Sequence, residues 1–172
     1  MTPPVLEGNK FCNTAIRVKN IDGSTSFYVG VLGMKELYRM ALQNATLVWL
    51  GYPNCADDST PLSRREGVLE LVAKKLTLEK DSHVDDQHDH SNSHPIKLAF
   101  HVADLPQFME RVKQQNIKVL KEVGAAEAPE AVASFMGCTP TDLKSDAVVW
   151  ESLKEVCFVE DPDGYLVEIV PY

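Results

Sequence analysis

The sequence predicts an α+β protein built from two β-α-β-β-β modules, and three observations support this fold class. An apolar run with one internal glutamate occurs twice, at Val68–Val72 and at Val167–Val170. A strand-like run followed by a helical pattern precedes each copy. The second copy also follows Asp161-Pro162-Asp163-Gly164, in which proline and glycine favour the tight turn of a hairpin. The chain is therefore predicted to be internally duplicated.

The first module is expected to span residues 8–80. Alternating residues predict a first strand at Asn13–Lys19. The polar run Gly23-Ser24-Thr25-Ser26 offers a cap for a helix near Ser24–Leu32, which Gly33 would end. Three further strands are predicted near Lys35–Met40, Thr46–Leu50 and Val68–Ala73.

The second module is expected to span residues 96–172 and to repeat this order of elements. Its predicted elements are a strand at Lys97–Ala103, a helix near Pro106–Gln115, and strands near Lys118–Glu122, Glu155–Glu160 and Tyr165–Val170. This module has more residues between its landmarks than the first, so an insertion is predicted at about 124–147.

An acidic, histidine-rich linker is predicted at residues 81–95, between the modules. Few of its residues are apolar, which favours a mobile, solvated segment. Its histidines could chelate Zn²⁺ or Ni²⁺ opportunistically, but their spacing matches no closed structural site. These histidines are His83, His88, His90 and His94.

Composition excludes several classes of protein. The 172 residues are 44% hydrophobic, as expected of a globular chain, and their net charge of −8 argues against a nucleic-acid or anionic-membrane surface. No apolar run reaches the length of a membrane span, and Met1–Asn9 lacks the features of a signal peptide. We therefore expect a soluble, cytoplasmic protein. The four cysteines are too sparse for a disulfide scaffold and are expected to be reduced.

Each strand glutamate needs a polar partner. An ionised carboxylate in an apolar run costs several kcal/mol when it is unpaired. Glu70 and Glu168 are therefore expected to face a polar cavity, a cation or a metal. They are the first candidate site residues.

Four segments in the right order resemble the vicinal-oxygen-chelate superfamily, the glyoxalase I, bleomycin-resistance and extradiol-dioxygenase group, with glyoxalase I as the nearest relative. The resemblance implies a curved mixed sheet around an open cavity, metal ligands on the first and last strands of each module, and a homodimer. The matching segments are Asn13–Leu37, Gly67–Val72, Ile96–Val112 and Cys157–Val170.

The resemblance assigns the ligand positions to Asn13, Glu70, Lys97 and Glu168. Glyoxalase I carries a histidine at the third of these, but the ammonium of Lys97 has no lone pair to give a metal. Lys97 is therefore expected to replace the cation between the two carboxylates, leaving no resident metal and no cofactor. A structural ion-pair cluster, and Zn²⁺ or Ni²⁺ bound through altered ligands, remain alternatives.

Substrate-binding candidates follow from strand alternation. Asn13 and Arg17 share one face of their strand, as Lys97 and His101 do. Arg17 matches the arginine with which glyoxalase I holds a glutathione carboxylate, so a glutathione conjugate is one candidate substrate. Arg17 could equally pair with a nearby acid, and His101 could be a hydrogen-bonded pocket histidine or a proton carrier. Four further residues could line the cavity or belong to the core: Trp49, Trp150, Phe135 and Met136.

These residues predict a metal-independent lyase or isomerase that transfers a proton next to the carbonyl of a small molecule. Glu168 would be the base, and Glu70 and Lys97 would support it. An isomerisation or cyclisation in a specialised pathway fits this chemistry. A non-catalytic ligand-binding protein of the bleomycin-resistance type and a metal-dependent glyoxalase I remain alternatives. An extradiol dioxygenase is disfavoured, because its Fe(II) needs two histidines.

Overall fold

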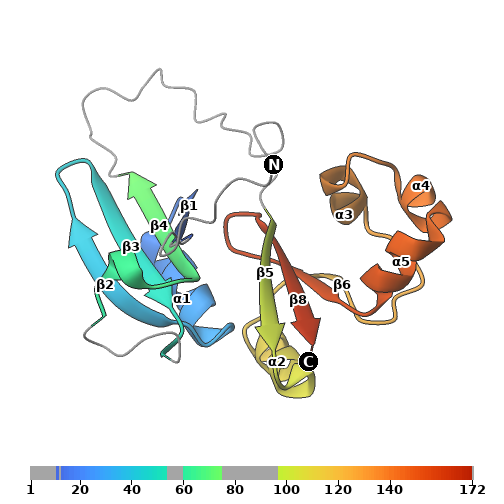
Figure 1. The fold of residues 1–172 in the computed structure, drawn as a ribbon, viewed down its shortest axis with the longest axis horizontal. Helices are drawn as coiled ribbons and strands as arrows, with labels where there is room; N and C mark the ends of the chain where they lie inside the picture. Colours follow the sequence, from blue (N-terminus) through green and yellow to red (C-terminus); the bar gives the residue numbers. More distant parts are fainter. Residues whose placement is uncertain (1–10, 12, 54–59, 75–96, 172) are drawn as a thin grey trace, which may run out of the picture. The chain divides into compact units, whose positions relative to one another are not determined.

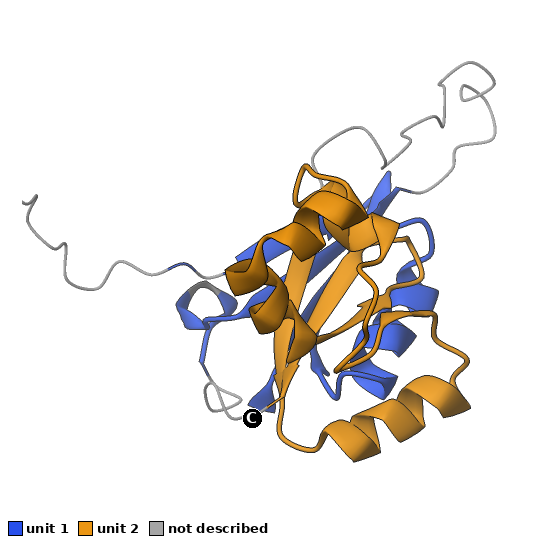
Figure 2. Cartoon of the chain, turned by 90° about the vertical axis from the view of Figure 1, so that its right-hand side faces the viewer, with its two compact units in different colours: residues 1–78 blue, residues 79–172 orange. Residues whose placement is uncertain are grey.

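The computed structural model describes residues 11, 13–53, 60–74 and 97–171. The chain forms two compact units, Met1–Leu78 and Glu79–Tyr172, coloured separately in Figure 2. Each unit contains a four-stranded mixed sheet, and the two sheets have equivalent strand orders, β1-β4-β3-β2 and β5-β8-β7-β6. The predicted α+β class is confirmed. The predicted linker and its histidines lie outside the described residues.

The first unit follows the predicted order of elements (Figure 1). Strand β1 runs parallel to β4, and the remaining neighbours in the sheet are antiparallel. A short 3₁₀ turn, η2, precedes β4. The elements are β1 (Asn13–Arg17), α1 (Ile21–Gly30), β2 (Lys35–Ala41), β3 (Ala45–Gly51), η2 (Leu62–Arg64) and β4 (Val68–Lys74).

Helix α1 begins earlier than predicted. Asn20, not the run at residues 23–26, caps it, and the Asn20 side chain accepts hydrogen bonds from the backbone N–H groups of Asp22 and Gly23 at 3.1 and 3.0 Å. Asparagine is among the best N-cap residues, so it takes the cap from the serines that follow. Those serines then lie within the first turns of the helix.

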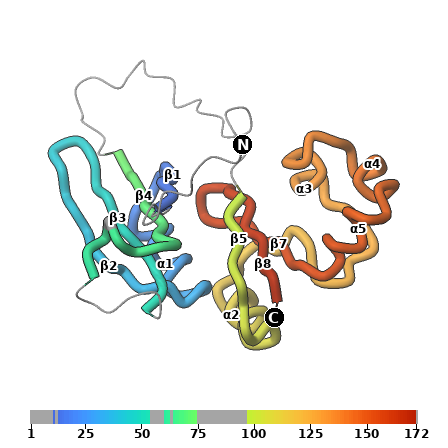
Figure 3. The backbone as a smooth tube through the Cα atoms, in the orientation of Figure 1, coloured from blue at the N-terminus to red at the C-terminus, as the bar shows by residue number. Residues whose placement is uncertain are grey.

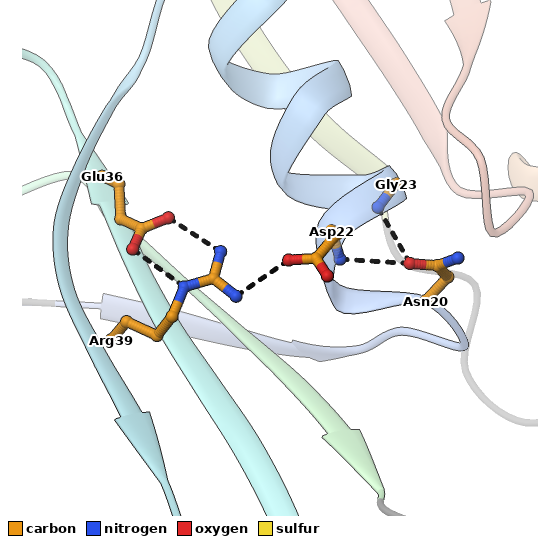
Figure 4. Close-up of polar contacts among 5 residues, drawn as sticks. All are labelled: Asn20, Asp22, Gly23, Glu36 and Arg39. Carbon is orange, nitrogen blue, oxygen red and sulfur yellow. Dashed lines mark hydrogen bonds and ion pairs between the residues drawn. The ribbon is translucent and has the colours of Figure 1, made fainter.

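A polar network joins α1 to the edge strand β2 (Figure 4). Arg39 donates to the carboxylates of Asp22 in α1 and Glu36 in β2, each at 2.9 Å. The hydrogen bond from Arg39 holds the pKa of Glu36 below its ordinary value. Because these side chains lie near the surface, we expect the network to orient β2 more than to stabilise the unit.

The second unit repeats this arrangement around a second sheet. Strand β5 runs parallel to β8, which is antiparallel to β7. The elements are β5 (Lys97–Val102), α2 (Leu105–Gln114), β6 (Val119–Lys121), α3 (Glu130–Phe135), α4 (Pro140–Ser145), α5 (Ala147–Lys154), β7 (Cys157–Glu160) and β8 (Leu166–Pro171).

The predicted hairpin joins β7 to β8. The buried Asp161 accepts hydrogen bonds from the N–H groups of Asp163 and Tyr165 at 2.9 and 2.8 Å. Gly164 has φ of 95°, which glycine adopts without strain. The turn thereby fixes the register that places Glu168 opposite Phe158.

The β6–β7 connection contains three helices, α3 to α5, which the sequence reading did not anticipate. Figure 3 traces the chain from the second sheet through these helices and back to β7. In the first unit the corresponding connection is only the turn at Leu42–Asn44, closed by a hydrogen bond from the Leu42 N–H to the Ala45 carbonyl. The three helices lie within the region where an insertion was predicted, and they extend beyond it to Lys154.

The two faces of the second sheet are covered by different helices. Phe108 and Val112 of α2 are buried, and Met109 contacts Cys157, which is paired with Ile169. Helices α3 to α5 pack against the opposite face, because Phe158 and Leu166 belong to their core cluster. Phe158 lies directly across from Glu168, so these helices cover the face that carries Glu168.

Candidate functional site

The two strand glutamates occupy equivalent positions in the two sheets. Glu70 lies across from Ala15 of β1, and Glu168 lies across from Ala99 of β5. Asn13 and Lys97 each stand two residues before that alanine, on the same face as the glutamate. The structure thus brings each glutamate beside the candidate residue of its own unit.

In the first unit, Asn13 is the partner of Glu70. The Asn13 Nδ2 donates a hydrogen bond to Oε2 of Glu70 at 2.9 Å, and both side chains are half-buried. The amide is neutral, so it satisfies one lone pair of the carboxylate without cancelling its charge.

In the second unit, Lys97 forms an ion pair with Glu168. The Lys97 Nζ donates to Oε2 of Glu168. The Glu168 side chain is only 13% exposed and that of Lys97 30%, so the pair is partly removed from water. The Phe135 ring lies 5.9 Å from Nζ of Lys97. A charged pair under an aromatic ring is electrostatically stronger than the same pair in water.

The pairing of Lys97 differs from one expectation. The sequence reading placed Lys97 between the two carboxylates, whereas its ion-pair partner is Glu168, and Glu70 is bonded to Asn13. Parallel pairing within each sheet explains this result, because it puts the first and last strands of one unit side by side. Sequence position alone could not choose between these partners.

Arg17 and His101 also occupy equivalent positions. Arg17 lies across from Val72, His101 lies across from Val170, and both are exposed. Strand alternation puts them on the same faces as Asn13 and Lys97. The structure places these side chains in line with the glutamates along each sheet, where they could contact a ligand bound at that face.

The residues at the four matched positions do not form a conventional four-ligand metal site. Lys97 supplies no lone pair, and its ammonium engages an oxygen of Glu168 that a metal would need. Within the described ranges no group of three or more His, Cys, Asp and Glu side chains could hold a metal ion. The chemistry of these donors, with one cation already in place, favours ion pairing over coordination.

Aromatic residues flank the two glutamates differently. Trp49 lies across from Glu70 and packs against Tyr38 with ring centroids 5.7 Å apart. Phe158, which the sequence reading missed, lies across from Glu168 and is buried. Counting back from the Asp161 turn along the antiparallel hairpin would have found it.

The other aromatic and apolar candidates have different roles. Trp150 is 5% exposed and belongs to the core cluster of α3 to α5. Its ring lies 5.9 Å from Nζ of Lys121. Met136 is 46% exposed, so it is not part of that core.

The sequence matches one family model, described as the glyoxalase/bleomycin resistance protein/dioxygenase superfamily, over residues 10–169. It is 30% identical over 173 residues to glyoxalase I from Saccharomyces cerevisiae, covering 96% of this chain and 44% of the yeast protein. It is 29% identical over 163 residues to lactoylglutathione lyase from Neisseria meningitidis, covering 94% of this chain and 89% of that enzyme. The chain therefore spans less than half of the yeast relative.

Solved structures show the same fold. Trypanothione-dependent glyoxalase I from Leishmania major aligns with a TM-score of 0.57 at 22% identity, over 95% of this chain and 87% of that one. An antibiotic-binding protein from Streptomyces aligns with a TM-score of 0.53 at 12% identity, over 97% of this chain and 98% of that one. Both an enzyme and a binding protein are thus among the structural relatives.

Proposed function

The chain belongs to the glyoxalase/bleomycin resistance protein/dioxygenase superfamily, and on this premise we propose that it is a lyase or isomerase acting by proton transfer next to a carbonyl. The observation that supports this proposal is the ion pair of Lys97 with the largely buried Glu168. It puts a carboxylate base and a cationic hydrogen-bond donor side by side, which are the two groups that enolisation needs.

In the proposed reaction, an oxygen of Glu168 removes a proton from the carbon next to the substrate carbonyl. The electron pair of that C–H bond forms the enolate double bond, and the negative charge moves to the carbonyl oxygen. The ammonium of Lys97 has three donors, of which Glu168 uses one, so another can hydrogen-bond the enolate oxygen. Return of the proton to the neighbouring carbon completes an isomerisation.

We assign supporting roles to the other residues. Glu70 is proposed as a second catalytic carboxylate, and Asn13 as the residue that orients it. Arg17 and His101 are proposed to bind the substrate, Arg17 through an anionic group such as a carboxylate of a glutathione conjugate. Lys97 would replace the metal, so no resident Zn²⁺ or Ni²⁺ is proposed. We also expect a cytoplasmic homodimer.

A substrate-independent assay tests the proposal. The protein would be incubated in D₂O with a panel of small α-hydroxycarbonyl compounds and with the glutathione adduct of methylglyoxal, while NMR follows loss of carbon-bound protons. We expect exchange with at least one compound, and at least 100-fold slower exchange in Glu168→Gln, because the amide has no basicity. Full exchange in Glu168→Gln together with none in Lys97→Met would show that Glu168 is not the base.

A ligand-binding function is the second candidate, and the aromatic residues of the first unit favour it. Tyr38 is 48% exposed, packs on Trp49 and lies on the face that carries Glu70. Such a face could stack a planar ligand. Bound small molecules detected by native mass spectrometry, released unchanged and without any proton exchange, would support this function against the enzyme.

A further inference from the structure

We infer that Phe135 is a positioning residue that holds the Lys97 ammonium against Glu168, so that the helices between β6 and β7 serve the reaction site. The catalytic consequence rests on the proposed function of Lys97. The positioning itself rests on contacts within the second unit and can be tested separately.

Phe135 has a fixed place beside Lys97. It is the last residue of α3, whose Val132 and Ala133 are 1% and 0% exposed. These two anchors join α3 to the cluster that packs on Phe158 of the sheet. The Phe135 ring is itself half-buried against this cluster. The ring therefore cannot move away from the sheet without disturbing a close-packed core.

The ring acts on Lys97 in two ways. Its face attracts the ammonium, whose Nζ lies 5.9 Å from the ring centroid. Its bulk also excludes water from one side of the pair, which strengthens the attraction between Lys97 and Glu168. A flexible lysine side chain would otherwise sample several rotamers, so the ring limits Lys97 to the one that reaches the carboxylate.

The first unit shows what the same sheet lacks without such helices. A short turn joins β2 to β3, and the residue across from Glu70 is Trp49, which is half-buried and neighbours the exposed Tyr38. Glu70 there is paired with the neutral amide of Asn13. A charged partner and a helix-borne aromatic ring thus occur together in the second unit.

NMR of the lysine ammonium groups tests this inference without any ligand. Protein with ¹⁵N- and ¹³C-labelled lysine would be compared with Phe135→Leu, Phe135→Tyr and a variant carrying pentafluorophenylalanine at position 135. Pentafluorophenylalanine preserves the shape of the ring but reverses its quadrupole. We expect proton exchange of the Lys97 ammonium to quicken about two- to fivefold in the leucine and fluorinated variants, and to stay near wild type in tyrosine.

Trp150→Phe is the matched control, because Trp150 lies over Lys121 at the same 5.9 Å distance. It should change the signals of Lys121 and leave those of Lys97 unaltered. If Phe135→Leu fails to fold, the fluorinated variant, which keeps the packing volume, still gives the answer.

The outcomes separate the inference from the proposed function. Unchanged Lys97 signals in every Phe135 variant would overturn the inference, whatever the rate of substrate proton exchange. Altered Lys97 signals with an undiminished rate of substrate exchange would support the positioning role and overturn the proposed catalytic role of Lys97. Altered signals together with slower exchange would support both.

Discussion

At the scale of single residues, the two glutamates are equivalent in position and different in surroundings. Glu168 is paired with a cation and is mostly buried, while Glu70 accepts from a neutral amide. A carboxylate beside an ammonium can abstract a proton while the same ammonium stabilises the developing negative charge. This difference underlies the proposed assignment of Glu168 as the base.

The first prediction compares the two carboxylates. Glu168→Gln should abolish substrate proton exchange, whereas Glu70→Gln should reduce it by about tenfold, the smaller effect expected of a supporting group. Thermal unfolding of both variants provides the control, because each substitution nearly preserves side-chain shape. Equal losses in the two variants would mean that the carboxylates share one role.

The second prediction concerns Cys157, which is 1% exposed. Burial raises the pKa of its thiol from 9.0 to about 11, against a smaller opposite effect of Lys121. A raised folded-state pKa gives stability that is complete below pH 9 and is lost as the pH rises through about 11. The free energy of unfolding should fall over this window by about 2 kcal/mol more in the wild type than in Cys157→Ala.

Denaturant titrations at a series of pH values measure this difference. The comparison with Cys157→Ala is needed because burial also lowers the pKa of Lys121, which gives a pH dependence of opposite sign. Parallel pH profiles for the two proteins would show that the thiol ionises as easily in the folded state as in the unfolded state.

At the scale of elements, the β7–β8 hairpin sets the register of Glu168. The Asp161 carboxylate accepts from two backbone N–H groups and is 4% exposed, so nothing else can replace those hydrogen bonds. The turn residues were evident in the sequence. The hydrogen bonds of the Asp161 side chain became visible only in the folded turn.

The third prediction tests this turn. Asp161→Ala should lower the free energy of unfolding by about 2 kcal/mol, because it leaves buried donors unsatisfied. Asp161→Asn keeps an acceptor oxygen and should cost less than half as much. Urea unfolding monitored by tryptophan fluorescence measures both, and an alanine variant as stable as the asparagine variant would contradict this role.

At the scale of the whole molecule, the duplicated sheet carries one retained pair of glutamates and a lysine where relatives have a ligand. The fourth prediction is that a variant with His83, His88, His90 and His94 changed to alanine binds less than one equivalent of Zn²⁺ or Ni²⁺. Lys97 provides a charge that opposes the ion. Elemental analysis after dialysis measures it, and one full equivalent would refute it.

The fifth prediction is that the methylglyoxal–glutathione adduct is isomerised slowly or not at all. A metal ion can stabilise transition-state charge by several kcal/mol, and one ammonium supplies less. The rate of thioester formation measures this activity, with and without a chelator. Chelator-insensitive turnover at a rate ordinary for enzymes would show that the ammonium suffices for this substrate.

The sequence by itself determined the fold class, the order of the strands along the chain, the β7–β8 turn and the two glutamates. These features are local: strand alternation, turn residues and a carboxylate in an apolar run can be read within a few residues. The helices α3 to α5 were missed even though Thr139 and Asp142 form a capping box, because they are short and have weak periodicity.

Only the tertiary structure decided the partner of each glutamate and the position of Phe135. Parallel pairing of β1 with β4 and of β5 with β8 joins residues far apart in the chain, so Lys97 meets Glu168 and Asn13 meets Glu70. The contact of Phe135 with Lys97 depends on how a helix packs on a sheet. Such contacts are set by side-chain packing across the fold, which no local sequence pattern specifies.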